Sequence, residues 1–170
     1  SVDPVRDKGV IDTELQLKDL ETVENRIAKV AKQAQTGGDK IAKRQYDILI
    51  RYKEALEQGL SARTVELDKE ERKVVQDLNL LTDKPVLYLC NVDEKSAVSG
   101  NKYTEAVAEA IKDENAEMLI VAAATEADIA ELESYEERQM FLEDMGLTES
   151  GVSRLIKAAY KLLNLETFFT

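Results

Sequence analysis

Two stretches near the start of the chain carry apolar residues at the three- and four-residue intervals of helices that bury one face. The first stretch holds Leu20, Val23, Ile27, Val30 and Ala34, and the second holds Ala42, Tyr46, Leu49, Tyr52, Leu56 and Leu60. Between them, Thr36-Gly37-Gly38-Asp39 supplies two helix-ending glycines and a candidate N-cap. The spacing predicts an antiparallel helical hairpin with a coiled-coil seam, its first helix beginning near Val10 or Ile11.

The pattern changes after Pro85 to two short, continuous apolar runs. Val86 to Cys90 form the first run, residues 118–124 form the second, and a helical pattern over Tyr103 to Lys112 lies between them. Continuous apolar runs bounded by polar residues are typical of strands that are buried on both faces. A strand, a helix and a strand in this order predict a βαβ unit with parallel pairing, and hence an α/β fold.

Three further helices are predicted over residues 126–132, 135–142 and 151–163, the last with a buried face of Val152, Leu155, Ile156, Ala159 and Leu162. Gly146 and Gly151 have the four-residue gap of a phosphate-binding Walker A loop. However, Val152 occupies the position that requires lysine, and no strand precedes Gly146. We interpret both glycines as helix-terminal residues, and the sequence contains no other phosphate-binding motif.

Charge is distributed unevenly along the chain. The formal net charge is −11, yet the segment from Arg26 to Lys53 holds eight basic and two acidic residues, a local charge of +6 that leaves −17 for the remainder. Lys40, Lys43 and Arg44 fall near the predicted tip of the hairpin. Such a segment either contacts the phosphates of RNA, as in a ribosome, or is a solvated face that keeps the hairpin soluble; the residues alone leave both open.

The composition excludes several classes of site. The chain has no histidine, so it contains neither a histidine general base nor a histidine-ligated metal site. Its single cysteine, Cys90, lies in an apolar run, as is typical of a core residue. The acidic clusters at residues 113–114 and 133–137 are interpreted as solvated surface. We predict no catalytic and no metal-binding residue in this chain, no membrane association and a cytoplasmic location.

The residues that end the two predicted strands are the candidates for ligand binding. Asn91-Val92-Asp93-Glu94 ends the first strand, and Ala122-Ala123-Ala124 ends the second. Ligand sites of open α/β sheets lie at the carboxyl ends of the strands, so we expect the two segments to meet in one pocket. In P-loop GTPases the corresponding segments read Asn-Lys-x-Asp and Ser-Ala-Lys and contact guanine. Taken alone, the first segment is better explained as an exposed turn with acids that face water, and only the second strand end favours a ligand site.

Longer matches point to a family. Five segments resemble the Obg-like ATPases, also called the YchF group, of the P-loop GTPase class: Asp3-Pro4-Val5-Arg6-Asp7, Glu14 to Val23, Leu78 to Tyr88, Asn91-Val92-Asp93-Glu94, and Phe141 to Leu147. The resemblance covers essentially the whole chain. It implies part of a P-loop NTPase (G-domain) parallel sheet with an inserted antiparallel coiled-coil helical hairpin.

The resemblance also implies a domain order. We expect a G-domain segment at residues 1–18, the hairpin at 19–68 and the C-terminal part of the G domain at 69–170. Because the sequence begins without methionine, we expect it to be part of a longer protein. In the family the P-loop and the ligands of Mg²⁺ lie outside this part, so we expect no ATPase activity from these 170 residues alone.

The family's Asn-x-x-Glu turn is associated with a preference for ATP over GTP. The resemblance implies that Asn91 contacts the base edge, that Val92 packs on the base or offers backbone groups, and that Glu94 sets the selectivity. Glutamate is one methylene longer than the aspartate of the guanine motif, so it would lose the paired hydrogen bonds to guanine. At the Ser-Ala-Lys position only backbone groups remain to bind the nucleotide, because the residues there are Ala122, Ala123 and Ala124.

The sequence thus predicts the base-binding part of an ATP-preferring P-loop ATPase or GTPase. At full length this protein would hydrolyse ATP with Mg²⁺, act as a monomer and contact a ribosome or RNA through its hairpin. The alternative is a non-catalytic ribosome- or RNA-binding coiled-coil module. A purely structural hairpin protein is a third interpretation, which leaves the two strand ends unexplained.

Overall fold

The computed structural model describes residues 2–35 and 39–166 and divides into two compact units. One unit is Arg6–Lys84, and the other combines Ser1–Val5 with Pro85–Thr170. Residues 36–38 of the predicted hairpin turn and residues 167–170 lie outside the described residues. The domain boundaries predicted at residues 18 and 68 come from the domain order of the family. The division into compact units does not test them, so they stay a prediction.

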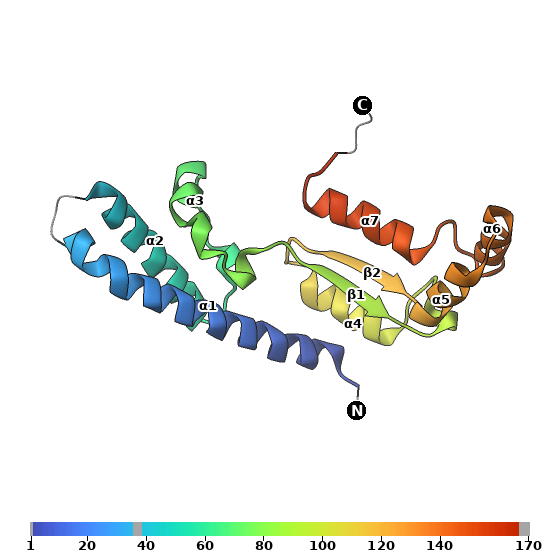
Figure 1. Ribbon diagram of the computed structural model, residues 1–170. Coiled ribbons are helices and arrows are strands. Elements are labelled where there is room, and N and C mark those ends of the chain that lie inside the picture. The colour runs from blue at the N-terminus through green and yellow to red at the C-terminus, as the bar shows by residue number, and fades with distance from the viewer. Residues whose placement is uncertain (1, 36–38, 167–170) are drawn as a thin grey trace. The chain divides into compact units, whose positions relative to one another are not determined.

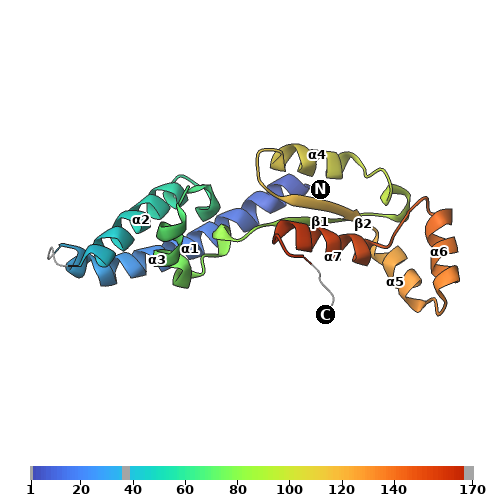
Figure 2. The same cartoon turned by 90° about the horizontal axis from the view of Figure 1, so that it is seen from above.

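The unit Arg6–Lys84 is built on two helices that run antiparallel, α1 (Pro4–Gln35) and α2 (Lys40–Glu57) (Figures 1 and 2). Asp39 caps α2 as predicted, because its carboxylate accepts hydrogen bonds from N–H groups of the first helical turn. The prediction that the first helix begins near Val10 was wrong. The helix starts at Pro4, a residue suited to a first helical turn, and Gly9 does not interrupt it.

Helix α3 (Lys69–Val75) and three short 3₁₀ helices (Ala62–Thr64, Gln76–Leu78 and Leu81–Asp83) complete this unit. Asp68 and Glu71 form a capping box at the start of α3, since each side chain accepts a hydrogen bond from the other residue's N–H. Burial raises the pKa of Tyr52 to about 12, so its phenol stays neutral at physiological pH. The buried apolar core consists of Val23, Val30, Ile48, Leu49, Tyr52, Leu56, Ala62, Val75, Leu78 and Leu80.

A carboxylate of α1 is buried against the 3₁₀ helices that follow α2 in the chain. Asp19 of α1 is 2% exposed and accepts three hydrogen bonds of 2.7 Å, two from the N–H groups of Leu81 and Thr82 and one from the Thr82 hydroxyl. The same hydroxyl accepts the N–H of Ala62 at 2.8 Å. These bonds tie α1 to two 3₁₀ helices that are distant from it in the sequence. The helical periodicity predicts only the neighbouring Leu20 as a core residue.

In the other unit, strands β1 (Leu87–Asn91) and β2 (Glu117–Val121) pair in parallel, as predicted, with Asn91 opposite Val121. Helix α4 (Lys102–Ile111) lies on one face of the sheet and α7 (Gly151–Leu162) on the other (Figures 1 and 2). Gly100 leads into α4 at φ +74°, and a Cβ there would press on the Thr104 hydroxyl and lie 2.9 Å from Ile120 Cδ1. Glycine therefore lets this loop approach the sheet closely.

Helices α5 (Ala123–Glu131) and α6 (Tyr135–Asp144) lie between β2 and α7 along the chain. The second strand is shorter than predicted, because β2 ends at Val121 and α5 already begins at Ala123. Gly146 follows α6 at φ +73° and Gly151 begins α7, as expected of helix-terminal glycines.

Helix α7 is less covered than its sequence predicts. Val152 and Ile156, expected on its buried face, are 58% and 52% exposed. The sheet on which it packs has two strands within the described residues. No helix within residues 2–35 and 39–166 is long and apolar enough to cross a membrane.

Candidate functional site

Two hydrogen bonds bring the carboxyl ends of β1 and β2 together. The N–H of Val92 donates to the carbonyl oxygen of Val121 at 2.8 Å, which extends the strand pairing by one residue. Beyond it, the N–H of Ala123 donates to Asn91 Oδ1 at 3.0 Å. The structure thus places Asn91 and the alanine segment side by side at one edge of the sheet.

The second of these bonds orients the carboxamide of Asn91. Its oxygen is the acceptor for the Ala123 N–H, so the two N–H groups of Nδ2 are left to donate. The residue as a whole is exposed. The end of β1 therefore presents a hydrogen-bond donor to a ligand that approaches this edge.

The turn after Asn91 uses its two acids differently. Asp93 caps the 3₁₀ helix Glu94–Ser96, since its Oδ1 accepts the N–H of Ser96 at 2.9 Å. The side chain and the N–H of Ser96 together hold the pKa of Asp93 below its usual range. Glu94 is exposed at the start of the same 3₁₀ helix, and Val92 is half-buried. The turn thus occupies the Asp93 carboxylate and leaves that of Glu94 facing solvent.

The three alanines lie in different environments at the start of α5. Ala122 is 4% exposed and precedes the helix without a side-chain cap, while Ala123 and Ala124 are exposed in its first turn. The N–H of Ala123 is taken by Asn91. The N–H of Ala124, which has no partner within its own helix, remains as a donor at the positive end of the helix dipole.

Sequence reasoning missed one residue near this edge. Glu126 of α5 accepts hydrogen bonds from the N–H groups of Gly151 at 2.6 Å and Val152 at 3.4 Å, the first two residues of α7. The only signal in the sequence is an acidic residue in a first helical turn. That signal indicates a favourable charge at the residue's own helix N-terminus and does not reveal a contact with a second helix.

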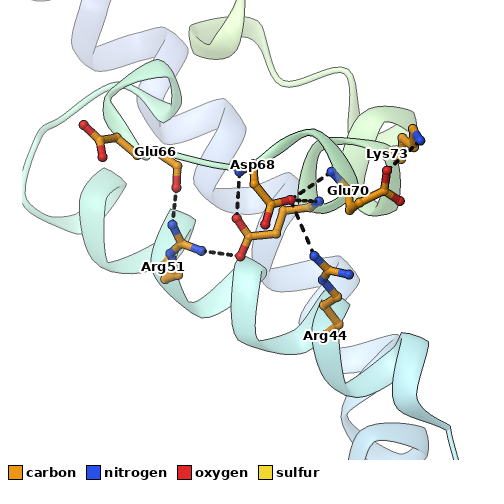
Figure 3. Close-up of polar contacts among 7 residues, drawn as sticks. Arg44, Arg51, Glu66, Asp68, Glu70 and Lys73 are labelled. Atoms are coloured by element: carbon orange, nitrogen blue, oxygen red, sulfur yellow. Dashed lines mark hydrogen bonds and ion pairs between the residues drawn. The ribbon is translucent and has the colours of Figure 1, made fainter.

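The hairpin is less positive than its sequence suggests, because acidic residues form ion pairs with several of its basic side chains. Figure 3 shows Arg44 and Arg51 of α2 pointing toward the segment around Asp68 that leads into α3, where Arg51 also donates to the carbonyl oxygen of Glu66. Among the described residues, ion pairs join Arg26 to Asp77, Arg44 to Asp68, Arg51 to Glu71 and Lys53 to Glu24, at 2.9, 3.5, 2.9 and 2.9 Å, and Lys53 also pairs with Glu57 at 3.6 Å.

The three residues predicted to contact RNA are therefore not equivalent. Lys40 and Lys43 are exposed in the first turn of α2 and form no ion pair within the described part of the chain. Arg44 instead forms an ion pair with Asp68, the residue that caps the N-terminus of α3. The N–H of Glu71, with a further contribution from Arg44, holds the pKa of Asp68 below its usual range.

The two acidic clusters have structural partners. Glu114 accepts a hydrogen bond from the Tyr88 hydroxyl at 2.7 Å, and Glu137 completes a capping box with Ser134. Among residues 2–35 and 39–166, no three His, Cys, Asp or Glu side chains are grouped so that they could hold a metal ion.

The chain is similar to named proteins over nearly its whole length. It is 49% identical over 171 residues to the ribosome-binding ATPase YchF of Bacillus subtilis (strain 168), which covers 99% of this chain and 46% of that protein. It is 38% identical over 175 residues to Obg-like ATPase 1 of Rattus norvegicus, which covers 100% of this chain and 44% of that protein. No model of a protein family matches the chain.

A solved structure is similar as well. The structure of the Schizosaccharomyces pombe YchF GTPase matches with a TM-score of 0.86 at 26% identity, over 96% of this chain and 45% of that one. This match confirms the predicted fold class, part of a G-domain sheet together with an antiparallel helical hairpin. The chain spans about half the length of the curated relatives it matches.

Proposed function

Since the chain belongs to the family of YchF and Obg-like ATPases, we propose that the ends of β1 and β2 bind the purine base in a protein that hydrolyses ATP. The observation that carries this proposal is the hydrogen bond from the Ala123 N–H to Asn91 Oδ1. It joins the two strand ends and orients the Asn91 carboxamide. Ligands of open α/β sheets bind at this edge of the sheet.

Asn91 is proposed to bind the purine ring without distinguishing adenine from guanine. Both purines have an acceptor at N7, and Nδ2 of Asn91 is the donor at the strand end. Val92, half-buried beside it, offers an apolar side chain to the base. Ala122 and Ala123 form the adjoining wall of the site, and Ala124 contributes its N–H.

Glu94 is proposed to set the preference for ATP over GTP. Guanine presents two adjacent N–H donors that suit a short aspartate, whereas adenine presents one amino donor and a ring acceptor. Asp93 is already bonded within its own turn, so Glu94 is the carboxylate of this turn that remains for a base.

Shortening the Glu94 side chain is expected to shift selectivity toward GTP. In a full-length family protein carrying this segment, Glu94→Asp should change the ratio of Kd for ATP and GTP about tenfold, or about 1.4 kcal/mol, the scale of one hydrogen bond to a charged group. Calorimetric titration with each nucleotide measures the ratio. Glu105→Asp, the same change at an exposed position of α4, is the control. An unchanged ratio in Glu94→Asp would remove Glu94 from the base site.

The hydrolytic step is assigned to parts of the full-length protein outside this chain. The sequence has no Walker A motif, and its described residues include no metal-binding cluster. We propose that other segments of the full-length protein bind the phosphates and Mg²⁺, as the resemblance to the family implies. We propose that the residues present here bind and select the base, and that the 170 residues alone do not hydrolyse ATP.

The hairpin is proposed to contact the ribosome through phosphate groups of its RNA. Bacterial relatives are described as ribosome-binding ATPases, and Lys40 and Lys43 are exposed cations without ion pairs in the described structure. A phosphate backbone attracts such side chains whatever its sequence. A ribosomal partner also supports a cytoplasmic location, and we keep the expectation of a monomer.

Neutralising both lysines is expected to weaken ribosome binding and to reduce its salt dependence. Each phosphate contact contributes about 0.7–0.9 to the slope of log K against log salt concentration, so Lys40→Gln/Lys43→Gln should lower the slope by about 1.5. Cosedimentation with ribosomes across salt concentrations measures this slope. Arg44→Gln, which breaks the ion pair with Asp68, is expected to change it less. A slope that the double variant leaves intact would favour a merely solvated hairpin face.

The second candidate function is a non-catalytic ribosome- or RNA-binding module. The exposed lysines favour it, but it leaves the joined strand ends without a role. Such a module would bind ribosomes in a salt-dependent way without any response to ATP. A G-x-x-x-x-G-K-[ST] loop elsewhere in the full-length protein would favour the hydrolase.

A further inference from the structure

Glu126 joins the helix that begins at the base site to the helix that covers one face of the sheet. Its carboxylate accepts the N–H of Gly151 at 2.6 Å and that of Val152 at 3.4 Å. A helix N-terminus carries unsatisfied N–H groups and a partial positive charge, so a carboxylate is a favourable partner there. Glu126 lies in the first turn of α5, where its own N–H donates to the carbonyl oxygen of Ala122 at 3.0 Å.

The position of Gly151 shows how closely α5, β2 and α7 are packed. A Cβ on this residue would lie 2.7 Å from Glu126 Oε1 and 2.9 Å from Val121 Cγ1, closer than side chains tolerate. Glycine at this position therefore lets α7 start in direct contact with both groups. Arg154, one turn further along α7, adds a second contact, because its guanidinium donates to the carbonyl oxygen of Ile120 at 2.8 Å.

We propose that Glu126 is a positioning residue for the purine site, an inference that rests on the proposed function of the strand ends. The first turn of α5 is held at two points, by Asn91 at the N–H of Ala123 and by α7 through Glu126. The N–H of Ala124 lies between these points in the same turn, so its direction depends on both. If the Glu126 contact with α7 is lost, the first turn of α5 is free to tilt, and the Ala124 N–H is misplaced.

Removing the carboxylate tests this role in a full-length family protein carrying the segment. Glu126→Ala is expected to raise the Kd for ATP about tenfold, and to leave unchanged the Kd for inorganic tripolyphosphate, which has no base. Glu126→Gln keeps one oxygen for the Gly151 N–H and is expected to restore most of the affinity. Thermal denaturation confirms that each variant is folded at the temperature of the titration.

Ser150→Ala is the control that separates positioning from helix stability. Ser150 Oγ accepts the N–H of Ser153 at 3.2 Å and caps the same helix through a bond that does not involve α5. Its removal should lower the melting temperature and leave the Kd for ATP unchanged. The inference is overturned if Ser150→Ala weakens ATP binding as much as Glu126→Ala does, or if Glu126→Ala weakens tripolyphosphate binding equally.

The same measurements distinguish this inference from the proposed function. If Asn91→Ala weakens ATP binding and Glu126→Ala does not, the base site stands and the positioning role is wrong. If neither variant changes ATP binding, the proposed base site itself is wrong, and the positioning role falls with it.

Discussion

Replacement of Asp19 by alanine is expected to lower the free energy of unfolding by about 3–5 kcal/mol. The carboxylate is 2% exposed and accepts three hydrogen bonds of 2.7 Å. Alanine leaves the N–H groups of Leu81 and Thr82 and the Thr82 hydroxyl without this acceptor, each at a cost of about 1–3 kcal/mol where water cannot replace it. Domains are commonly stable by only about 5–15 kcal/mol, so the loss is large. Urea denaturation followed by far-UV circular dichroism measures it.

Glu21→Ala is the matched control, since it removes a carboxylate from the same helix two residues away. Glu21 pairs with Lys18 at 2.7 Å, but the two side chains are 61% and 64% exposed, and such exposed pairs contribute little to stability because water screens them. The loss in free energy of unfolding for Asp19→Asn should fall between those of the two alanine variants. Its amide keeps one acceptor oxygen but turns its N–H groups toward other donors. Equal losses in Asp19→Ala and Glu21→Ala would show that Asp19 contributes no more than a surface charge.

Asp19 also shows why the helical unit could be predicted only in part. The caps Asp39 and Asp68 bond to N–H groups within the next three residues, so the local sequence reveals them. Asp19 is 62 residues from Leu81, and its partners are mainly backbone groups, which leave no signature in a sequence. Periodicity identifies Leu20 as a core residue, but it cannot show that the neighbouring acid is buried as well.

The net charge summed along the hairpin segment overstates its free positive charge for a related reason. The sum over Arg26 to Lys53 is correct, but the acids that neutralise it lie outside that segment. Asp68 and Asp77 belong to the part of the chain that folds back against α2 and α1. The free positive charge is consequently smaller, and it includes Lys40 and Lys43 at the start of α2.

At the strand ends, the order of the apolar runs was enough to predict that Asn91 and the alanines lie at one edge. The contacts themselves could not be predicted. The bond between Asn91 Oδ1 and the Ala123 N–H depends on the directions of two backbone segments that are 32 residues apart. Glu126 and Gly151, which are 25 residues apart, meet only because α7 returns to the sheet.

Asn91→Ala is expected to raise the Kd for ATP and for GTP alike, by about tenfold to a hundredfold. The variant loses the proposed donor to N7 of the purine and the oxygen that holds the first turn of α5. N7 is common to adenine and guanine, so the ratio of the two Kd values should stay unchanged, in contrast to Glu94→Asp. Calorimetric titration of a full-length family protein carrying this segment measures both values.

Asn91→Asp separates the two contributions. Aspartate keeps an oxygen for the Ala123 N–H but has no N–H donor, so we expect an affinity loss as large as that of Asn91→Ala with a smaller loss of stability. Asn101→Ala removes another helix-capping asparagine of the same unit, which accepts the N–H groups of Tyr103 and Thr104, and should lower stability without changing either Kd. If Asn91→Asp bound ATP as tightly as the unmodified protein, the Asn91 amide would have no part in base binding, and the end of β1 would be an ordinary exposed turn.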